Sequence, residues 1–578
     1  MKKVLLLCLC LMVLAFPALA DQAMNPGTYS AQEQGFGGPI SVEVTVSETE
    51  ILGVSITGDA ETPGLGAVAV DVLDEAIVDA QTPNVDVVAG ASVSSRAIIA
   101  AATHALEEAG ADIAALDTAR KDSAGDVQKE AVTLDCDVVI VGAGGAGMTA
   151  AINLVQAGKQ VILLEKMPYV GGNTTKATGG MNAAETHYQA EQGISDSVET
   201  FVEDTMAGGH NLNNRDLVTV MAQNSAAGID WLDSIGAPLP NVSFSGGATN
   251  ARIHAPADGS GVGGYLVKAF SDKLAELGLE PMLNVRATEL LSKDGKVTGV
   301  LASSDKADYT INAGAVILTS GGFGANEDMY TQYRPDLKGT VTTNAPGATG
   351  DGIVMAQAVG ADLVDIDQIQ LHPTVEQTTS ILITESVRGH GAILVNQKGE
   401  RFINELETRD VVSAAELEQE GCYAYIIFDQ RLREGLKAIE KYVTNGLTVQ
   451  SDTVEGLAGE IGCDPSVLVK TMEDWNKAVA DKNDPLFGRT TAMEEDLSVP
   501  PYYAIKIAPG IHHTMGGIKI NTRAEVIDTN GAVIPGLFAA GEVTGGVHGG
   551  NRIGGNAVAD IVVFGRIAAQ SVLDYLAK

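Results

Sequence analysis

The N-terminal part of the chain alternates apolar and polar residues in short runs that predict a small α+β unit. Every second residue is apolar in "ISVEVTV" (40–46) and nearly so in "ILGVSITG" (51–58), which predicts two strands. Helices are predicted at about 67–79 and 95–109, and the serine-rich stretch "DVVAGASVSS" (86–95) leads into the second one. We therefore predict a domain over 24–112, followed by a charged linker over 113–133.

The pattern changes at Cys136, where a strand, a glycine loop, a helix and another strand follow in succession. The stretch "CDVVIVGAGGAGMTAAINLVQAGKQVILLEK" has the texture of one complete βαβ unit. After a long middle part the chain returns to a glycine-rich tail, "PGLFAAGEVTGGVHGGNRIGGNAVADI". We predict an α/β domain in two parts, 134–366 and 514–578, with an inserted domain at 367–513.

Composition and charge narrow the class of protein. A chain of 578 residues with 45% hydrophobic residues and 66 glycines is typical of a globular α/β protein with several units. Its 37 basic and 74 acidic residues give a net charge of −37, which argues against nucleic acid or an anionic membrane surface as a partner. An anionic substrate would therefore need local, buried cations.

The first twenty residues predict export. Two lysines, an apolar run over 4–16, and Ala18 and Ala20 form the pattern of a cleaved signal peptide (1–20). An uncleaved anchor is the alternative, but this run is shorter than the ~20 residues that span a bilayer. We expect secretion across the cytoplasmic membrane to the periplasm or cell surface. The cysteines that would remain, Cys136, Cys422 and Cys463, are too scattered for a disulfide framework or a metal site.

The glycine loop is the strongest local motif, Gly142-x-Gly144-x-x-Gly147. It follows an apolar strand at 138–141 and opens a helix, so backbone N–H groups at a helix N-terminus can meet a pyrophosphate. Glu165 ends the next strand, where a carboxylate can bond ribose hydroxyls. A purely structural turn is the alternative, and the motif alone leaves NAD and FAD open.

Three further stretches resemble the flavoprotein fold of fumarate reductases, succinate dehydrogenases and their relatives: "EKMPYVGGNTTKATGGMNAA", "NAPGATGDGI" and "LFAAGEVTGGVHGGNRIGGNAVADI". The resemblance covers Cys136 to the C-terminus. It implies an FAD-binding Rossmann-like domain with an inserted α+β capping (clamp) domain. It implies FAD contacts at the three loop glycines and at Ala146, Glu165, Asn173, Thr174, Gly179, Asp351, His513, Glu542, Ala557 and Val558. Respiratory-complex relatives carry a flavin-linking histidine where Asn173 stands, so non-covalent FAD is expected.

Five separate stretches match the soluble, periplasmic fumarate reductases: "QLHPT", "LITESVRG", "NELETRD", "GIHHTMGG" and "HGGNRIGG". Singly, such histidines more often fill polar cores and such arginines lie on surfaces, so their joint occurrence carries the inference. The resemblance implies a substrate-binding set of His372, Thr384, Glu385, His512 and Arg552. It assigns the proton donor to Arg409, refilled through Glu385 and Arg388, although arginine's high pKa makes it a poor donor by itself.

The implied reaction is reduction of an α,β-unsaturated carboxylate, most simply fumarate to succinate, by hydride from FAD N5 and a proton from Arg409. The alternatives are another enoate (urocanate, acrylate or an aryl-acrylate), a dehydrogenase of steroid-like ketones, and a non-catalytic flavin electron-storage protein. Leu382 departs from the methionine that relatives often carry. His372 and Glu385 are kept, whereas urocanate-type reductases replace them.

The serine-rich stretch resembles the FMN-attachment motif of small flavin-carrying domains, such as that of a sodium-translocating quinone reductase. The motif is matched at Asp86, Gly90, Ala91, Ser92 and Ser94, and Ala89 departs from it. The resemblance implies a small α+β FMN-binding domain with covalent FMN on Ser94; the alternative is a serine-rich helix cap. The chain has no C-x-x-C-H haem motif, so FMN is the expected electron inlet. Its expected partners are a flavin transferase and a membrane-associated quinol or flavin relay.

Overall fold

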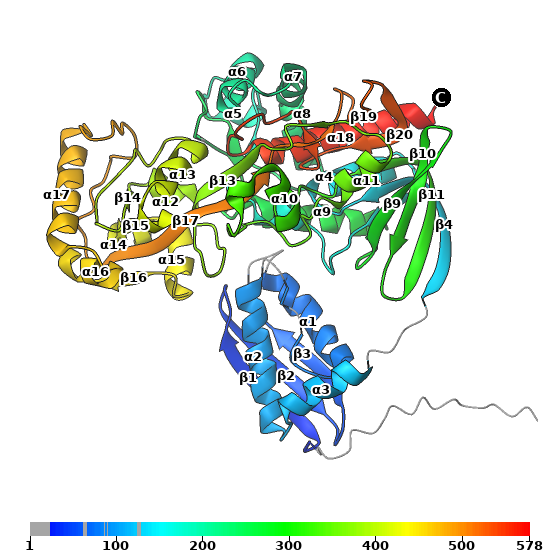
Figure 1. Ribbon diagram of the computed structural model, residues 1–578, viewed down its shortest axis with the longest axis horizontal. Helices are drawn as coiled ribbons and strands as arrows, with labels where there is room; N and C mark the ends of the chain where they lie inside the picture. The colour runs from blue at the N-terminus through cyan, green and yellow to red at the C-terminus, as the bar shows by residue number, and fades with distance from the viewer. Residues whose placement is uncertain (1–23, 62–65, 86, 89–90, 124–128, 245) are drawn as a thin grey trace, which may run out of the picture. The chain divides into compact units, whose positions relative to one another are not determined.

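The computed structural model describes residues 24–61, 66–85, 87–88, 91–123, 129–244 and 246–578. These residues form two compact units, one over 24–123 and one over 129–578 (Figure 1). The predicted signal peptide lies outside the described residues, as do Asp86, Ala89 and Gly90 of the FMN-attachment motif.

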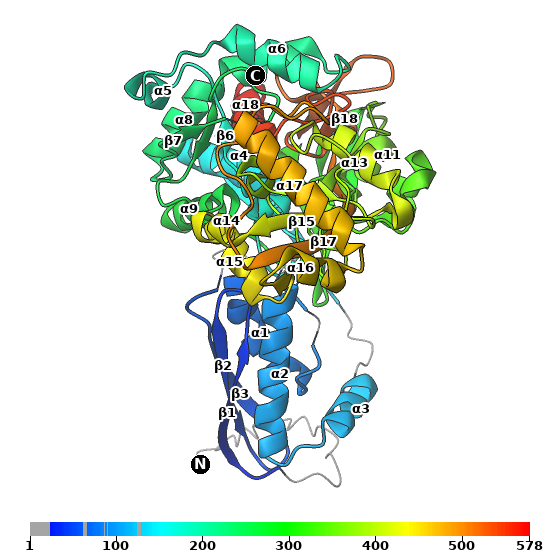
Figure 2. The same cartoon turned by 90° about the vertical axis from the view of Figure 1, so that its left-hand side faces the viewer.

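The first unit is a three-stranded antiparallel sheet covered by helices. Its strands, in the order β1-β2-β3, are β1 (Gly27–Gln34), β2 (Pro39–Val46) and β3 (Ile51–Thr57). The alternation predicted for β2 is observed, since Ile40, Val42, Val44 and Val46 are buried. The helices α1 (Gly66–Ala80) and α2 (Ser92–Glu108) pack against the sheet and each other (Figure 2).

Two local features of this region differ from the sequence-based expectation. Helix α2 begins at Ser92 rather than at 95, so Ser94 lies within its first turn and not before it. The predicted linker over 113–133 contains a helix, α3 (Ile113–Ser123), and the first residues of the next strand, β4 (Glu130–Val141). Leu116 of α3 is buried, so this charged segment buries an apolar side chain that its overall composition did not indicate.

The second unit is built on a seven-stranded sheet. Its parallel strands are β5 (Val161–Leu164), β4, β11 (Ala307–Leu318) and β20 (Val533–Ala539), side by side in that order. Strands β9 (Arg286–Lys293), β10 (Lys296–Ser303) and β19 (Glu525–Ile527) add to it antiparallel. The pairing of β20 with β11 brings the C-terminal tail back into the sheet.

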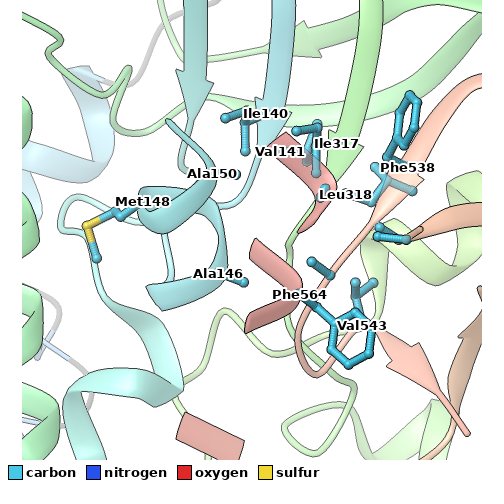
Figure 3. Close-up of a cluster of buried hydrophobic side chains, with 14 of the residues drawn as sticks. Ile140, Val141, Ala146, Met148, Ala150, Ile317, Leu318, Phe538, Val543 and Phe564 are labelled. Atoms are coloured by element: carbon cyan, nitrogen blue, oxygen red, sulfur yellow. The ribbon is translucent and has the colours of Figure 1, made fainter. Parts of the chain in front are cut away.

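The core beside this sheet joins residues from both ends of the unit. Ile140 and Val141 of β4, Ile317 and Leu318 of β11, and Phe538 of β20 belong to one buried cluster with residues of the helices α4 (Gly145–Gln156) and α18 (Asn556–Leu576) (Figure 3). Helix α18 is long and apolar enough to span a membrane by length and composition, but 67% of its apolar window is buried inside the protein. Burial in this core accounts for its hydrophobicity.

The clamp region has a sheet and a hydrophobic core of its own. Its strands are β13 (Ile369–Val375), β17 (Tyr502–Thr514), β15 (Ala424–Asp429) and β14 (Ile393–Val395) in that order, with β16 (Val449–Ser451) also on β17. Its helices are α12 (Glu385–Gly389), α13 (Arg409–Leu417), α14 (Gln430–Gly435), α15 (Lys437–Thr444), α16 (Val454–Ile461) and α17 (Pro465–Asp481). Most of the buried apolar side chains of these elements form a second cluster, separate from the core beside the large sheet, whereas Ile369 of β13 and Ile511 of β17 belong to that first core.

The remaining elements surround the large sheet. One small sheet consists of β6 (Met181–Asn182), β8 (Ile253–Ala255) and β7 (Asn241–Ser243). Another consists of β12 (Leu363–Val364), β18 (Gly517–Lys519) and β21 (Thr544–Gly545). The helices are α5 (His187–Glu191), α6 (Val198–Gly208), α7 (Arg215–Gln223), α8 (Ser225–Ser234), α9 (Val262–Glu276), α10 (Glu327–Tyr333) and α11 (Asp351–Ala358). Strand β17 carries His512 and His513 near its end, and β18 follows it directly in the chain.

Candidate active site

The glycine loop lies between β4 and α4 and leaves no room for a side chain at Gly142 or Gly147. Gly142 has φ +105°, and a Cβ on it would lie 2.6 Å from the Thr319 carbonyl oxygen. A Cβ on Gly147 would lie 2.0 Å from the Gly142 carbonyl oxygen. Gly144 is the N-cap of α4 and supplies no side-chain cap. The Gly145 N–H donates to Thr174 Oγ1 at 3.0 Å, and the next N–H groups of the first turn remain for a ligand.

A cavity of about 100 Å³ lies over this loop. Of the residues predicted to contact FAD, it is lined by Gly142, Gly144, Ala146, Glu165, Asn173, Thr174, Asp351 and Glu542. Glu165 accepts hydrogen bonds from the backbone N–H groups of Ala143 and Met167, and burial raises its pKa. Asp351 accepts a two-pronged contact from Arg286, with both N–O distances 2.9 Å. Gly147 does not line the cavity; it packs behind the loop.

A second, larger cavity of about 960 Å³ begins where the first ends, because Asn173, Thr174 and Glu542 line both. Asn173 donates to Asn344 and Glu542 and accepts from the Ala345 N–H, so its side chain is held in place from three sides. The rest of the predicted FAD contacts, Gly179, His513, Ala557 and Val558, line this second cavity. Two adjoining cavities with an uncapped helix N-terminus at one end fit a long dinucleotide such as FAD.

The clamp and the large sheet together bring the predicted reaction centre into this second cavity. His372, Thr384, Glu385, Arg388, Arg409, His512 and Arg552 all line it. They come from β13, the start of α12, the start of α13, the end of β17, and the loop before α18. Residues separated by up to 180 positions thus line one cavity.

Glu385 and Arg409 form a two-pronged pair at the centre of the wall. Arg409 Nε lies 2.8 Å from Glu385 Oε1, and Arg409 Nη2 lies 3.1 Å from Oε2. Arg388 Nη2 lies 3.7 Å from Glu385 Oε1. Burial would raise the pKa of Glu385, but the charge and hydrogen bonds of Arg409 outweigh it and hold this pKa well below its usual range. Glu385 is therefore an ionised acceptor between two guanidinium groups.

The two substrate-site histidines are neutral. Burial, reinforced by Arg409, lowers the pKa of His372 and of His512 well below the ordinary value. His372 is fully buried and its Nε2 atom has no hydrogen-bond partner among the described residues. The ring centroids of the two histidines lie 5.2 Å apart. A buried imidazole nitrogen without a partner, facing a cavity, is available to a ligand.

Around Glu385, the wall of the cavity carries more positive than negative charge, because Arg388, Arg409 and Arg552 face this one ionised carboxylate. Over the whole cavity, Lys176 and the three arginines are matched in number by Glu385, Glu407, Glu542 and Asp560. Burial, helped by Arg409, lowers the pKa of Arg552 to about 9, and its Nε atom has no hydrogen-bond partner among the described residues. A cluster of buried cations is costly without an anion, so the end of the cavity around Glu385 is suited to a carboxylate ligand.

Arg388 is fixed by a buried ionic network within the clamp. Its Nη1 atom donates to the Glu405 carbonyl oxygen at 2.6 Å, and Arg489 Nη2 donates to the Arg388 carbonyl oxygen at 2.7 Å. Glu405 also pairs with Arg401 and Arg489, whose guanidinium groups lie over the Trp475 ring. The position of Arg388 is therefore determined by the clamp core.

Sequence reasoning missed several polar residues of the site. Gln370 accepts from Arg409 Nη1 at 2.9 Å and donates to the Arg552 carbonyl oxygen. It stands two residues before His372 on the same strand, so a period of two could have identified it. Glu416 follows Arg409 by two helical turns, and neither of its carboxylate oxygens has a partner among the described residues. Burial raises the pKa of Glu416 well above the ordinary value, against the opposing charge of Arg388.

In the first unit, Ser94 is fully buried and its Oγ donates to Glu61 Oε2 at 2.7 Å. The residue at the N-cap of α2 is Ala91, which supplies no side-chain cap, and Ser95 Oγ accepts from the Val88 N–H. The described atoms therefore do not show Ser94 as a helix cap. Within the described residues, no three histidine, cysteine or acidic side chains are grouped so as to hold a metal ion, and Cys136, Cys422 and Cys463 are not in disulfides.

Two families of known domains match the chain. The FAD binding domain family matches residues 137–558, and the FMN-binding domain family matches residues 35–107. The NADH:fumarate oxidoreductase of Klebsiella pneumoniae (strain 342) is 42% identical over 96% of the chain, and the chain spans 59% of the length of that relative.

Two further comparisons extend over most of both partners. The urocanate reductase of Eggerthella lenta is 37% identical over 94% of this chain and 91% of its own length. The solved structure of the open conformation of a flavocytochrome c3 fumarate reductase is 44% identical, covers 80% of this chain and 81% of its own, and superposes with a TM-score of 0.69.

The close packing behind the glycine loop predicts the effect of a single methyl group. Gly147→Ala would place a Cβ 2.0 Å from the Gly142 carbonyl oxygen, so the loop must move and FAD binding is lost. The measurement is FAD released per chain, read by absorbance. The matched control is Gly459→Ala in α16, where a Cβ meets nothing within 4 Å. Full FAD content in a folded Gly147→Ala variant would contradict this role.

Proposed function

Because the chain belongs to the flavoprotein family of the fumarate reductases and related enoate reductases, with an FMN-binding domain ahead of its FAD-binding domain, we propose that it reduces fumarate to succinate. The family, the fold class and the enzyme class predicted from the sequence, an FAD-dependent oxidoreductase acting on carbon–carbon bonds, are thereby confirmed. The substrate, the mechanism, the covalent FMN and the location are proposals.

One observation carries the choice of a carboxylate substrate: a single cavity wall joins three guanidinium groups and two neutral histidines to one ionised carboxylate. In the proposed binding mode, His512 and Arg552 hold one substrate carboxylate. His372, Thr384 and Glu385 contact the other end, where the partnerless His372 Nε2 supplies a hydrogen bond. Gripping both ends orients the double bond and draws charge toward the held carboxylate.

FAD, when bound non-covalently by the residues that line the two cavities, supplies the hydride that the reduction requires. The chain supplies the proton. Arg409 gives a proton to the substrate carbon and is restored by a relay from solvent. Arg388, 3.7 Å from Glu385, takes a proton from solvent and gives one to the Glu385 carboxylate. Glu385 passes that proton to Arg409, against which it is held at 2.8 Å and 3.1 Å, and is ionised again. A donor refilled this directly is never stably deprotonated, which removes the objection raised by the high pKa of arginine.

We further propose that FMN is attached to Ser94 through a phosphoester and supplies the entry point for electrons. Ser94 lies in the first turn of the 17-residue helix α2, where the helix dipole favours a phosphate. The FMN-binding domain family covers this position. The proposal includes a flavin transferase for loading, a membrane-associated quinol or flavin relay as electron donor, and an extracytoplasmic location, supported by the signal-like sequence of 1–20.

A second candidate substrate is urocanate, favoured by a relative that aligns over nearly the whole chain. Fumarate is preferred because the chain keeps both His372 and Glu385 at the end of the cavity where urocanate-type reductases differ. Both candidates use the same proton donor and the same flavin site, so they differ only in the residues that hold the far end of the substrate.

The substrate assignment is tested by anaerobic oxidation of a reduced viologen, which replaces the natural electron donor. We expect kcat/KM for fumarate to exceed that for urocanate, acrylate and cinnamate by roughly 10- to 100-fold, because each charged hydrogen bond to a second carboxylate contributes about 1.5–3 kcal/mol. Turnover of a monocarboxylate and none of fumarate would exclude the two-ended grip.

The proton donor is tested by Arg409→Ala. We expect viologen-driven turnover of fumarate to fall by roughly 10²- to 10⁴-fold, the usual contribution of a positioned acid, with FAD still bound. Arg431→Ala is the control, since Arg431 makes a partly exposed ion pair with Glu495 in the same clamp region and should leave turnover unchanged. Substantial fumarate reduction by Arg409→Ala would refute the assignment.

The FMN attachment is tested by mass spectrometry of the chain produced together with a flavin transferase. Wild type should carry one FMN in excess of its polypeptide mass, and Ser94→Ala should carry none while keeping FAD and viologen-driven activity. Ser95→Ala, which alters the neighbouring hydroxyl, should keep the FMN adduct. An adduct that persists in Ser94→Ala would move the attachment point elsewhere.

A further inference from the structure

Glu61 is a buried carboxylate in the first unit that the proposed function does not use. Its side chain is 4% exposed. Glu61 Oε1 accepts from the Gly37 N–H at 3.0 Å, and Oε2 accepts from Ser94 Oγ at 2.7 Å. No ion pair involves Glu61 among the described residues of this unit. An acidic group is thus held without a counter-charge against the hydroxyl of Ser94.

Glycines on both sides hold this carboxylate in place. A Cβ on Gly35 would lie 2.2 Å from Glu61 Oε1, and a Cβ on Gly66 would lie 1.8 Å from Oε2. Neither glycine has a positive φ, so space and not backbone conformation requires glycine here. The Cβ on Gly66 would also lie 2.9 Å from Ser94 Oγ. The Glu61 carboxylate and the Ser94 hydroxyl are therefore packed into one closely fitted site.

We propose that Glu61 is the general base that takes the Ser94 hydroxyl proton when the FMN group is transferred to that hydroxyl. The inference rests on the proposed attachment of FMN to Ser94. The FMN donor is a phosphoanhydride of FMN, such as FAD. The Ser94 Oγ–phosphorus bond forms, the pyrophosphate bond breaks, and AMP leaves with the bonding electron pair. The proton moves from Oγ to Glu61 Oε2, and no oxidation or reduction takes place.

Distance and charge both fit this role. The 2.7 Å separation of Glu61 Oε2 and Ser94 Oγ is within the reach of a general base. A serine hydroxyl is a weak nucleophile until a neighbouring base takes its proton. The proton that Glu61 gains also leaves it neutral beside the new phosphodiester anion, which avoids two adjacent buried anions.

A purely structural role is the competing explanation, and Glu61→Gln separates the two. The amide can still accept from the Gly37 N–H and bond to Ser94 Oγ, but it cannot take a proton. With purified full-length chain, FAD and flavin transferase, we expect the rate of FMN incorporation to fall by roughly 10²- to 10⁴-fold in Glu61→Gln. The readouts are the mass of the chain and flavin fluorescence in a denaturing gel. Incorporation at the wild-type rate would overturn the proposal.

Controls separate failure of this inference from failure of the proposed attachment. Glu108→Gln alters an exposed glutamate on α2 and should load FMN normally. FMN retained by Ser94→Ala would refute the attachment itself, whereas normal loading of Glu61→Gln would refute only the base. Circular dichroism reports whether Glu61→Gln folds. If it does not, Glu61→Asp decides: a folded Asp variant that loads FMN supports an acidic base, and one that fails to load contradicts it.

Discussion

The active site depends on holding positive charge in a buried cavity of an acidic protein. Arg388, Arg409 and Arg552 lie around one ionised carboxylate, Glu385, and buried cations in excess are tolerated only where the surrounding structure holds them. Here the clamp holds Arg388 through Glu405 and Arg489, and Gln370 holds Arg409 from the opposite side to Glu385. The clamp's buried polar groups therefore fix two of the three guanidinium groups, those of Arg388 and Arg409.

Burial, aided by the same positive charge, determines the state of the histidines. Burial and the nearby arginines keep His372 and His512 neutral, so they can donate a hydrogen bond to a carboxylate without adding another charge. Charge is left to the arginines, which remain protonated more easily than any other side chain. The arginines therefore attract the substrate, and the histidines help to orient it. Arg409 also lies beside Glu385, which passes protons to it in the proposed mechanism.

Glycines serve different purposes in the two flavin-binding units. In the second unit, Gly142 and Gly147 bring the loop close to its own backbone so that an uncapped helix N-terminus meets the ligand. In the first unit, Gly35 and Gly66 leave the space that the carboxylate of Glu61 occupies. The glycine loop of the second unit suits a dinucleotide that is held without a covalent bond. The glycines around Glu61 in the first unit suit a hydroxyl that forms a single covalent bond.

Local pattern was enough to predict the βαβ unit, two of the three strands of the N-terminal unit, and the glycine loop, because these depend on residues close together in the chain. Resemblance supplied the reaction centre residue by residue. Sequence did not predict the start of α2 at Ser92, the helix within the predicted linker, the buried Glu416, or the polar partners Gln370 and Glu405. Cap choice, burial and long-range hydrogen bonds decide those features, and among them only Gln370 has a local signal, its place two residues before His372 on the same strand. By itself the sequence determined which residues are available for the chemistry. Only the tertiary structure decided that residues from five segments share one cavity wall, because their charges and pKa values arise from burial against one another.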